Sequence, residues 1–313
     1  MELRQLRYFV AILEHGSLSR AAKVLHIVQP ALSQQLQQLE EELGASLMHR
    51  SAQGMQATDA GKIFYQHAQA ILKQVHDAKS AVTQSTDKPS GTVALGIPQS
   101  ASGALALPLL TAVRATYPDI VFQLTEELTG NLTEQLRAGR LNLAILFDDG
   151  QLAGFNLKPM VEEEMMYITR ADSQFATQRK SITLAKALQA SLILPSIAHG
   201  VRPRIESRVR QAGLEIKQVI DITSIAILKS AIMADMGATI LPVSPFLAEI
   251  QRGEMRASSI SASDLSRTVV LCSNKNLPLT NAALAVEKLV LDVSRELCAS
   301  GRWIGAHSLL PST

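Results

Sequence analysis

Apolar side chains recur at helical spacing through the first sixty residues and predict three short helices. Gly16 and Gly44 stand where the first and third helices would end, and Pro30 fits the first turn of the third helix, where no N–H is needed. The apolar positions of the first helix are Leu3, Leu6, Val10 and Leu13, and those of the third are Leu32, Leu36, Leu39 and Leu43. Three short helices with a tight turn between the last two are typical of a helix-turn-helix.

A longer helical stretch follows, from residue 59 to about residue 86, with Thr58 as its expected N-cap. Its apolar positions are spaced by 4, 3, 4, 3 and 4 residues, which is a heptad seam of the kind that pairs two helices. The seam residues are Phe64, Ala68, Ile71, Val75, Ala78 and Val82. An amphipathic helix that packs on its own core is the alternative. Its position between a small module and a large one, before the hinge TDKPSG, favours the pairing of two chains.

Beyond residue 92, short apolar and β-branched runs alternate with helical stretches, which is typical of an α/β domain with largely parallel sheets. The runs that we interpret as strands are TVALGI, DIVFQLTEE, LNLAILF, MMYITR, SLILP, VIDIT, ATILP and RTVVLC. We therefore divide the 313 residues into a helix-turn-helix domain over 1–58, a linker helix and hinge over 59–91, and a large domain over 92–313.

The outer face of the third helix carries amide and hydroxyl side chains opposite its leucines. By the helical period this face contains Pro30, Gln34 and Gln37, with Ser33 and Gln38 beside them. Glutamine can pair with adenine and serine can meet bases or phosphates, so the face can read DNA, but a merely solvated surface is an open alternative. Charge does not decide between them, because residues 1–60 hold five Lys/Arg and six Asp/Glu, a balance of 5 − 6 = −1, and the whole chain carries +2.

The run GSLSRAAKVLHIVQPALSQQLQQLEEELGASLMHR, followed by TDAG, resembles the signature of LysR-type bacterial transcription regulators along its whole length. The order HIVQPALSQQ with TDAGKIFYQHA is similar to the nitrogen-assimilation-control-like branch of that family. The resemblance implies an α+β winged helix-turn-helix whose recognition helix meets DNA and whose wing places Arg50 at the phosphate backbone. The sequence departs from the family at Val28, where a capping serine is common. The expected DNA contacts are Ser19, Gln29, Pro30, Ser33, Gln34, Gln37 and Arg50.

The same resemblance implies that the large α/β domain is two-lobed and periplasmic-binding-protein-like, with a chain that crosses twice between the lobes. One lobe would hold residues near 92–161 and 267–300, and the other residues 162–266. The cleft between the lobes is the expected site of a small, anionic effector. The expected effector contacts are Ser100, Ser102, Thr129, Gly200, Val201, Arg202 and Thr223. Serine and glycine are also ordinary turn residues, and arginine is an ordinary surface residue, so the alternative of plain loops stays open.

Taken together, these features predict a DNA-binding transcription regulator and not an enzyme. The expected partners are double-stranded DNA with inverted repeats, further copies of the chain in a homodimer or homotetramer, and a small effector, while RNA polymerase is left open. The alternative is a small-molecule-binding module with a dimerising helical N-terminus. The sequence has no P-loop, HExxH, paired CxxC or metal-ligand spacing, so we expect no cofactor and no metal. Two cysteines, no apolar signal core and no membrane-length apolar run predict a cytoplasmic protein.

Overall fold

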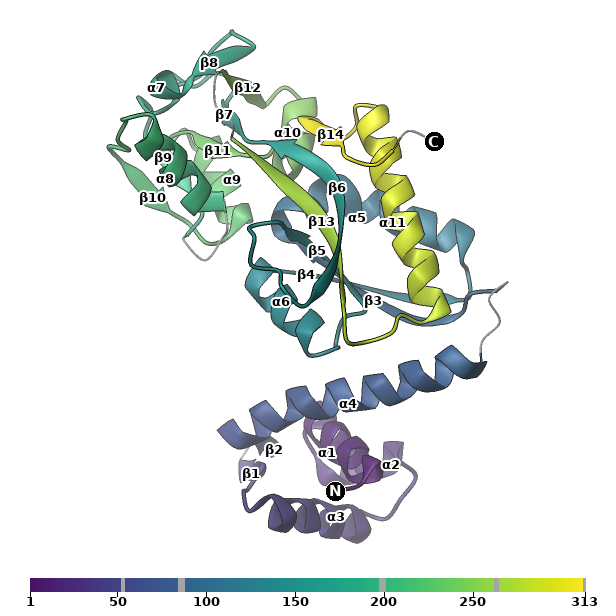
Figure 1. Ribbon diagram of the computed structural model, residues 1–313. Coiled ribbons are helices and arrows are strands. Elements are labelled where there is room, and N and C mark those ends of the chain that lie inside the picture. Colours follow the sequence, from purple (N-terminus) through teal and green to yellow (C-terminus); the bar gives the residue numbers. More distant parts are fainter. Residues whose placement is uncertain (52–53, 84–87, 197–200, 262–264, 312–313) are drawn as a thin grey trace. The chain divides into compact units, whose positions relative to one another are not determined.

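The structure is a computed structural model that describes residues 1–51, 54–83, 88–196, 201–261 and 265–311 (Figure 1). Within these ranges the chain separates into an N-terminal unit that ends with Thr83 and a C-terminal unit that holds the larger sheets. Each unit encloses its own buried hydrophobic cluster. Among the described helices, none is both long and apolar enough to cross a membrane.

The N-terminal unit consists of three short helices, a two-stranded hairpin and one long helix. Its elements are α1 (Leu3–His15), α2 (Leu18–Val24), α3 (Gln29–Leu43), β1 (Met48–Ser51), β2 (Gly54–Ala57) and α4 (Asp59–Thr83). Gly16 and Gly44 adopt the left-handed conformation that ends α1 and α3, as the sequence predicts. The Ser17 hydroxyl caps α2 by accepting a hydrogen bond from the Arg20 N–H at 3.4 Å. Val28 stands at the N-cap of α3 and supplies no side-chain acceptor.

The core of this unit forms between α1 and the helices that pack around it. Its buried leucines on α3 are Leu32, Leu36 and Leu39. Leu43, the last residue of the predicted stripe, is exposed because α3 ends there. Phe64 of α4 packs edge-on against Phe9 of α1, with ring centroids 5.1 Å apart, and Ala68 of α4 is fully buried. The amino-terminal half of α4 therefore contributes to the core. The predicted end of this helix near residue 86 lies outside the described residues.

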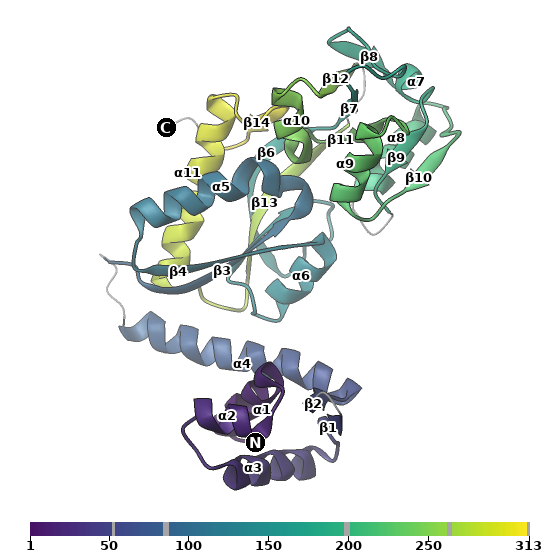
Figure 2. The ribbon, with the colours of Figure 1, turned by 180° about the vertical axis from the view of Figure 1, so that it is seen from behind.

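A six-stranded sheet of order β14-β6-β13-β5-β3-β4 forms the first lobe of the C-terminal unit. Its strands are β3 (Gly91–Pro98), β4 (Ile120–Glu127), β5 (Leu143–Phe147), β6 (Phe155–Glu164), β13 (Ser266–Asn274) and β14 (Ala306–Ser308), and its helices are α5 (Gln99–Thr116), α6 (Thr129–Arg137) and α11 (Asn281–Ala299). Helices α5 and α11 cover one face of the sheet and α6 covers the other (Figure 2).

The second lobe contains a four-stranded sheet of order β11-β7-β12-β8 and a parallel pair of strands, β10 and β9. Its strands are β7 (Met166–Arg170), β8 (Ser181–Thr183), β9 (Leu192–Leu194), β10 (Val219–Asp221), β11 (Thr239–Leu241) and β12 (Met255–Ser261). Its helices are α7 (Leu184–Ala187), α8 (Val201–Gln211), α9 (Ile225–Met233), the 3-10 turn η1 (Ser244–Phe246) and α10 (Leu247–Gln251).

The chain passes between the lobes twice, from β6 to β7 and from β12 to β13. The first passage follows Glu164 and the second precedes Ser266. The expectation of largely parallel sheets is wrong. The two passing strands β6 and β13 lie side by side and antiparallel, and β7 is antiparallel to both β11 and β12. Because a strand that leaves a lobe and a strand that returns to it run in opposite directions, a double passage between lobes produces mixed sheets.

Candidate functional site

The predicted DNA-contacting side chains lie on the surface of the N-terminal unit. The exposed set is Ser19, Gln29, Pro30, Ser33, Gln34, Gln37 and Arg50. Gln37 donates from Nε2 to Oε1 of Glu41 at 2.8 Å, whereas the side chains of Ser33 and Gln34 make no hydrogen bond with the residues that the structure describes. Because the leucines of α3 hold the helix from behind, Ser33 and Gln34 face outward with their donors and acceptors free.

The amino end of α3 adds a second feature to this surface. Val28 gives no side-chain cap and Pro30 has no N–H, so the remaining N–H groups of the first turn are open to an outside acceptor. An uncapped helix start favours a phosphate oxygen. The acidic residues lie at the opposite end of α3, where Glu42 binds the amino group of Met1 at 2.6 Å. The amino end of α3 is therefore polar and uncharged, and the acids of this helix lie at its other end.

The hairpin of β1 and β2 forms a wing beside α1. Its strands are antiparallel, with Arg50 opposite Met55, and residues 52–53 lie outside the described residues. The Met55 N–H donates to the Gly16 carbonyl at 3.0 Å, and Gly54 lies so close to that carbonyl that a β-carbon would not fit. The wing is thus fastened to the α1–α2 turn through backbone contacts. Arg50 is exposed on β1 and forms no ion pair within the described part of the chain.

The heptad positions of α4 divide into two groups. Phe64 and Ala68 belong to the core of the N-terminal unit, so packing within one chain already accounts for both. The other positions are the half-buried Val75 and the exposed Ile71, Ala78 and Val82. The part of the predicted seam that a second chain could cover is therefore the row from residue 71 to residue 82.

Ser100, the second residue of α5, is already engaged by the protein. Arg267 of β13 donates from Nη1 to the Ser100 hydroxyl at 2.9 Å and from Nη2 to the Ser100 carbonyl at 3.2 Å. Ser100 is only 7% exposed. The Ser102 hydroxyl donates to the Gln99 carbonyl at 3.1 Å. An anionic effector at the start of α5 would have to displace the guanidinium from Ser100 before this hydroxyl could serve it.

Arg267 belongs to a buried ion pair that the sequence analysis did not anticipate. Its Nε and Nη2 donate to Oε2 of Glu163 at 2.8 and 2.6 Å, and its guanidinium lies 3.7 Å from the ring centroid of Phe147. Trp303 donates from Nε1 to Oε1 of Glu163 at 2.9 Å. Burial lowers the pKa of Arg267, and the Glu163 carboxylate opposes this shift. The single tryptophan was the available signal, because a buried indole N–H needs an acceptor.

Arg202, on α8, is held by two carboxylates of the second lobe. Its Nε donates to Oε1 of Glu206 at 2.5 Å and its Nη1 donates to Asp221. Burial by itself lowers the pKa of Arg202, but the hydrogen bonds with Glu206 and Asp221 outweigh burial and raise it. Val201 is buried in the core, and Gly200 lies outside the described residues. The expected cationic contact for an effector is therefore already neutralised within the lobe.

The two predicted threonines of the effector site lie in different lobes. Thr129 is half-buried at the start of α6, where its carbonyl accepts a hydrogen bond from the Thr133 hydroxyl at 2.8 Å. Thr223 is exposed directly before Ser224, which caps α9 by accepting a hydrogen bond from the Ile227 N–H at 3.4 Å. Each of the two threonines therefore stands at the amino end of a helix, one in each lobe.

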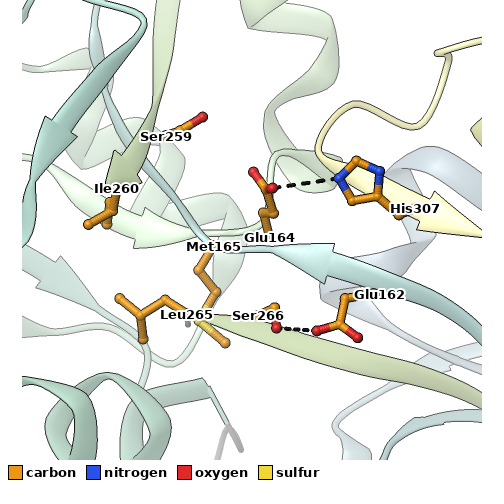
Figure 3. A pocket seen from close by; sticks show the side chains of 8 residues that line it. All are labelled: Glu162, Glu164, Met165, Ser259, Ile260, Leu265, Ser266 and His307. Carbon is orange, nitrogen blue, oxygen red and sulfur yellow. Dashed lines mark hydrogen bonds and ion pairs between the residues drawn. The ribbon is translucent and has the colours of Figure 1, made fainter. Parts of the chain in front are cut away.

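A cavity of about 450 Å³ lies beside the two passages between the lobes and is lined by residues of β6, β12, β13 and β14 (Figure 3). On its wall Glu164 faces His307 at 3.6 Å, and the Ser266 hydroxyl donates to Glu162. Because the carboxylates of Glu162 and Glu164 would repel a negative charge, this cavity does not suit the anionic effector that we expected. Within the described residues, no three His, Cys, Asp or Glu side chains are grouped so that they could hold a metal ion.

The arrangement as a whole defines a class of protein. An outward-facing recognition helix in a winged helix-turn-helix unit, joined to a two-lobed α/β unit, is the architecture of a DNA-binding transcription regulator. The chain belongs to the LysR family of these regulators. The profile described as "Bacterial regulatory helix-turn-helix protein, lysR family" matches residues 3–62, and the profile described as "LysR substrate binding domain" matches residues 86–295.

Comparison with individual proteins agrees with this assignment. The nitrogen assimilation regulatory protein nac of Escherichia coli (strain K12) is 36% identical over 296 residues, which cover 94% of this chain and 95% of that protein. A full-length variant of OxyR from Pseudomonas aeruginosa has a TM-score of 0.70 at 22% identity and covers 99% of both chains. Full-length CbnR in complex with its target DNA has a TM-score of 0.69 at 23% identity, over 94% of this chain and 100% of CbnR. The likeness to these two structures is one of fold, and it confirms the predicted fold class.

Proposed function

We propose that this LysR-type regulator reads inverted-repeat operators through the amino-terminal half of α3. The observation that carries the proposal is the outer face of that helix, where Ser33 and Gln34 are exposed with free hydrogen-bonding groups. Gln34 would pair with adenine in the major groove, and Ser33 would meet a base edge or a phosphate. Gln29 and Pro30 would lie beside the phosphate backbone at the start of the helix, and Arg50 would reach the backbone from the wing.

Pairing of two chains through α4 completes this proposal. The exposed row Ile71, Ala78 and Val82 follows the spacing of a two-helix seam, and small alanine side chains let helices approach closely. A twofold dimer presents two recognition helices to two half-sites about one helical turn apart. A homotetramer, built as a dimer of dimers, would bind two such operators at once and gain affinity from its several DNA-binding heads.

A small-molecule effector in the C-terminal unit is the remaining element of the proposal. The expected anion would have to compete with Arg267 for Ser100 and with two carboxylates for Arg202. A ligand shifts an equilibrium only through its differential affinity for the two states. An effector would therefore act by favouring an arrangement in which the Ser100 hydroxyl is released from Arg267.

The relatives favour a physiological role for the regulator. A nitrogen assimilation regulatory protein is 36% identical along nearly the full length of the chain, so we propose genes of nitrogen assimilation as targets. Transcript levels in a strain with and without the gene, grown with ammonium in excess or limiting, test this role. Target transcripts that differ only under nitrogen limitation are expected, and no difference in either condition would contradict it.

Footprinting tests the central claim. Purified protein is incubated with DNA upstream of its own gene, with and without nonspecific competitor DNA. Protection of an inverted repeat that survives the competitor is expected. Salt-sensitive binding without a footprint, or no binding, would instead favour the alternative of a small-molecule-binding module with a dimerising N-terminus.

A further inference from the structure

We propose that Glu40 is a positioning residue for DNA binding, because its carboxylate fixes the base of the wing to the recognition helix. The inference rests on the proposed function, in which α3 meets base edges and Arg50 of the wing meets the phosphate backbone. Both contacts can form together only if the wing stands at a fixed place relative to α3. The half-buried side chain of Glu40 supplies that connection.

One carboxylate oxygen of Glu40 accepts two backbone hydrogen bonds from the segment that leads into the wing. Oε1 accepts from the Leu47 N–H at 2.7 Å and from the Met48 N–H at 3.1 Å. The Ser46 hydroxyl lies 3.4 Å from the same oxygen and 3.1 Å from the Met48 carbonyl, and its single proton is shared between the two acceptors. The main-chain carbonyl of Glu40 also accepts from the Ala45 N–H at 3.2 Å, which closes the end of α3. Hydrogen bonds to an ionised acceptor are roughly twice as strong as bonds between neutral groups. No cation within the described ranges pairs with this carboxylate and competes for it.

The same segment is fastened from its other side by the start of α4. Thr58 donates its hydroxyl to the Ser46 carbonyl at 2.7 Å and its N–H to the Leu47 carbonyl at 3.0 Å. Gly61 lies so close to the Leu47 carbonyl that a β-carbon would not fit. The base of the wing is therefore clamped between Glu40 on α3 and the first turn of α4, so it cannot shift without breaking one set of bonds.

This clamp determines where Arg50 stands. Arg50 lies two residues beyond Met48 on β1, about 7 Å further along a strand that rises roughly 3.3 Å per residue. The neighbouring acids make other contacts, because Glu41 accepts a hydrogen bond from within α3 and Glu42 binds the N-terminal amino group. Of the three consecutive acids, Glu40 is the one that contacts the described residues of the wing.

A double-mutant cycle between Glu40 and Arg50, measured on the operator with the full-length protein, tests the inference. Arg50→Ala alone should weaken operator binding several-fold. In a Glu40→Ala background, Arg50→Ala should add less than about twofold, because the wing is then already out of place. Glu41→Ala removes the same charge from the same helix without touching the wing, so Arg50→Ala should keep its full effect in that background.

Two conservative variants of Glu40 distinguish the effect of side-chain length from the effect of negative charge. Glu40→Gln keeps an oxygen acceptor at the same distance, although with weaker hydrogen bonds, and should preserve most of the dependence on Arg50. Glu40→Asp keeps the charge but is one methylene shorter, so it should lose that dependence. If aspartate behaves like the native residue and glutamine does not, the negative charge and not the contact matters, and the proposal is overturned.

A measurement without DNA keeps this inference distinct from the proposed function. Hydrogen–deuterium exchange of the peptide that contains Leu47 and Met48 should be about tenfold faster in Glu40→Ala and unchanged in Glu41→Ala. Unchanged exchange in Glu40→Ala, or full additivity in the cycle, would overturn the positioning role. If Arg50→Ala has no effect on the otherwise native protein, the wing contact of the proposed function is wrong, and amide exchange alone then decides the role of Glu40.

Discussion

The side chains expected to contact DNA and those expected to contact an effector differ in what they already bind. On α3, Ser33 and Gln34 are exposed and free of hydrogen bonds within the described part of the chain. In the C-terminal unit, Ser100 is bound by Arg267, and Arg202 is paired with two carboxylates. Ser33 and Gln34 are thus free to bind a partner, whereas a ligand at Ser100 or Arg202 must replace hydrogen bonds that these residues make within the protein.

This difference has a physical reason. Polar groups on a surface that binds DNA exchange hydrogen bonds with water for hydrogen bonds with DNA. These groups can therefore stay hydrated in the free protein. Buried polar groups such as those of Ser100 and Arg202 have little access to water, so they must find protein partners. Substitutions can show whether the buried contacts of the C-terminal unit stabilise the fold. They can also show whether the exposed side chains of α3 affect DNA binding without affecting stability.

The largest effect is expected from loss of the buried guanidinium. Arg267→Ala leaves Glu163 without its cation in a place where both side chains are at most 1% exposed. Breaking a buried pair by removing one partner lowers stability by about 3–5 kcal/mol. Urea denaturation followed by circular dichroism measures this loss.

The control for this variant is Arg252→Ala, which removes an exposed cation that pairs with Glu249 and Glu254. Its urea midpoint should stay near that of the native protein. If Arg267→Ala denatures at the same urea concentration as this control, the buried pair does not stabilise the fold. The contrast between structural contacts in the C-terminal unit and free side chains on α3 would then be wrong.

The next effect concerns the surface of α4. Ile71→Asp places a charge in the middle of the exposed row, where a paired chain would have to bury it at a cost of several kcal/mol. We expect light scattering to show a lower mass than that of the native protein. Gln66→Asp, at an exposed position outside the heptad seam, should keep the native mass. A native mass for Ile71→Asp would contradict pairing through this row.

Gln34→Ala should weaken specific binding by about 1–3 kcal/mol, the loss expected for one bidentate base contact. Fluorescence anisotropy with operator DNA and with a scrambled duplex separates this loss from general affinity. Binding to the scrambled duplex and the thermal midpoint should not change, because the side chain is exposed and unbonded. Gln189→Ala, an exposed glutamine of the second lobe, is the matched control. Equal weakening on both duplexes would remove Gln34 from base reading.

The fold could be predicted wherever local rules decide it. The left-handed glycines, Pro30 in the first turn and the leucine period determine the N-terminal helices, and all eight predicted apolar runs overlap strands. The strands β6, β8, β12 and β14 were not predicted. β6 ends in three glutamates, which look like a solvated run. Glu163 is buried there because Arg267 and Trp303, more than 100 residues away, supply its partners.

The site was predictable to a similar degree. Exposure on α3 follows from the helical period, so the exposed polar residues of this helix could be chosen from the sequence. The hydrogen bond that Ser100 accepts comes from Arg267, 167 residues further along the chain, so no local sequence pattern could predict it. The heptad seam was predicted as one row, but its first two positions pack inside the unit because α4 has to cover α1 before it can meet another chain.

A smaller effect is expected at the wing. Arg50→Ala should weaken binding to all DNA similarly and reduce the slope of log affinity against log salt by about one unit, since one phosphate contact is lost. Titrations at several salt concentrations measure the slope. Arg210→Ala, an exposed arginine of α8, should leave the slope unchanged. An unaltered slope for Arg50→Ala would exclude the phosphate contact.

The smallest effect is expected from oxidants. Burial raises the pKa of the Cys272 thiol to about 12, and burial together with the nearby Glu163 raises that of Cys298 to about 11. Because the thiolate is the reactive form, both thiols are almost entirely protonated near neutral pH and should react slowly. Hydrogen peroxide should therefore leave operator affinity unchanged, while the same treatment in urea oxidises both residues. Loss of affinity together with oxygen added to either cysteine, detected by mass spectrometry, would contradict this expectation. It would show that the C-terminal unit responds to oxidants although its thiols are protected by burial. The contrast between an exposed α3 surface and a C-terminal unit whose polar groups bind one another would then not hold.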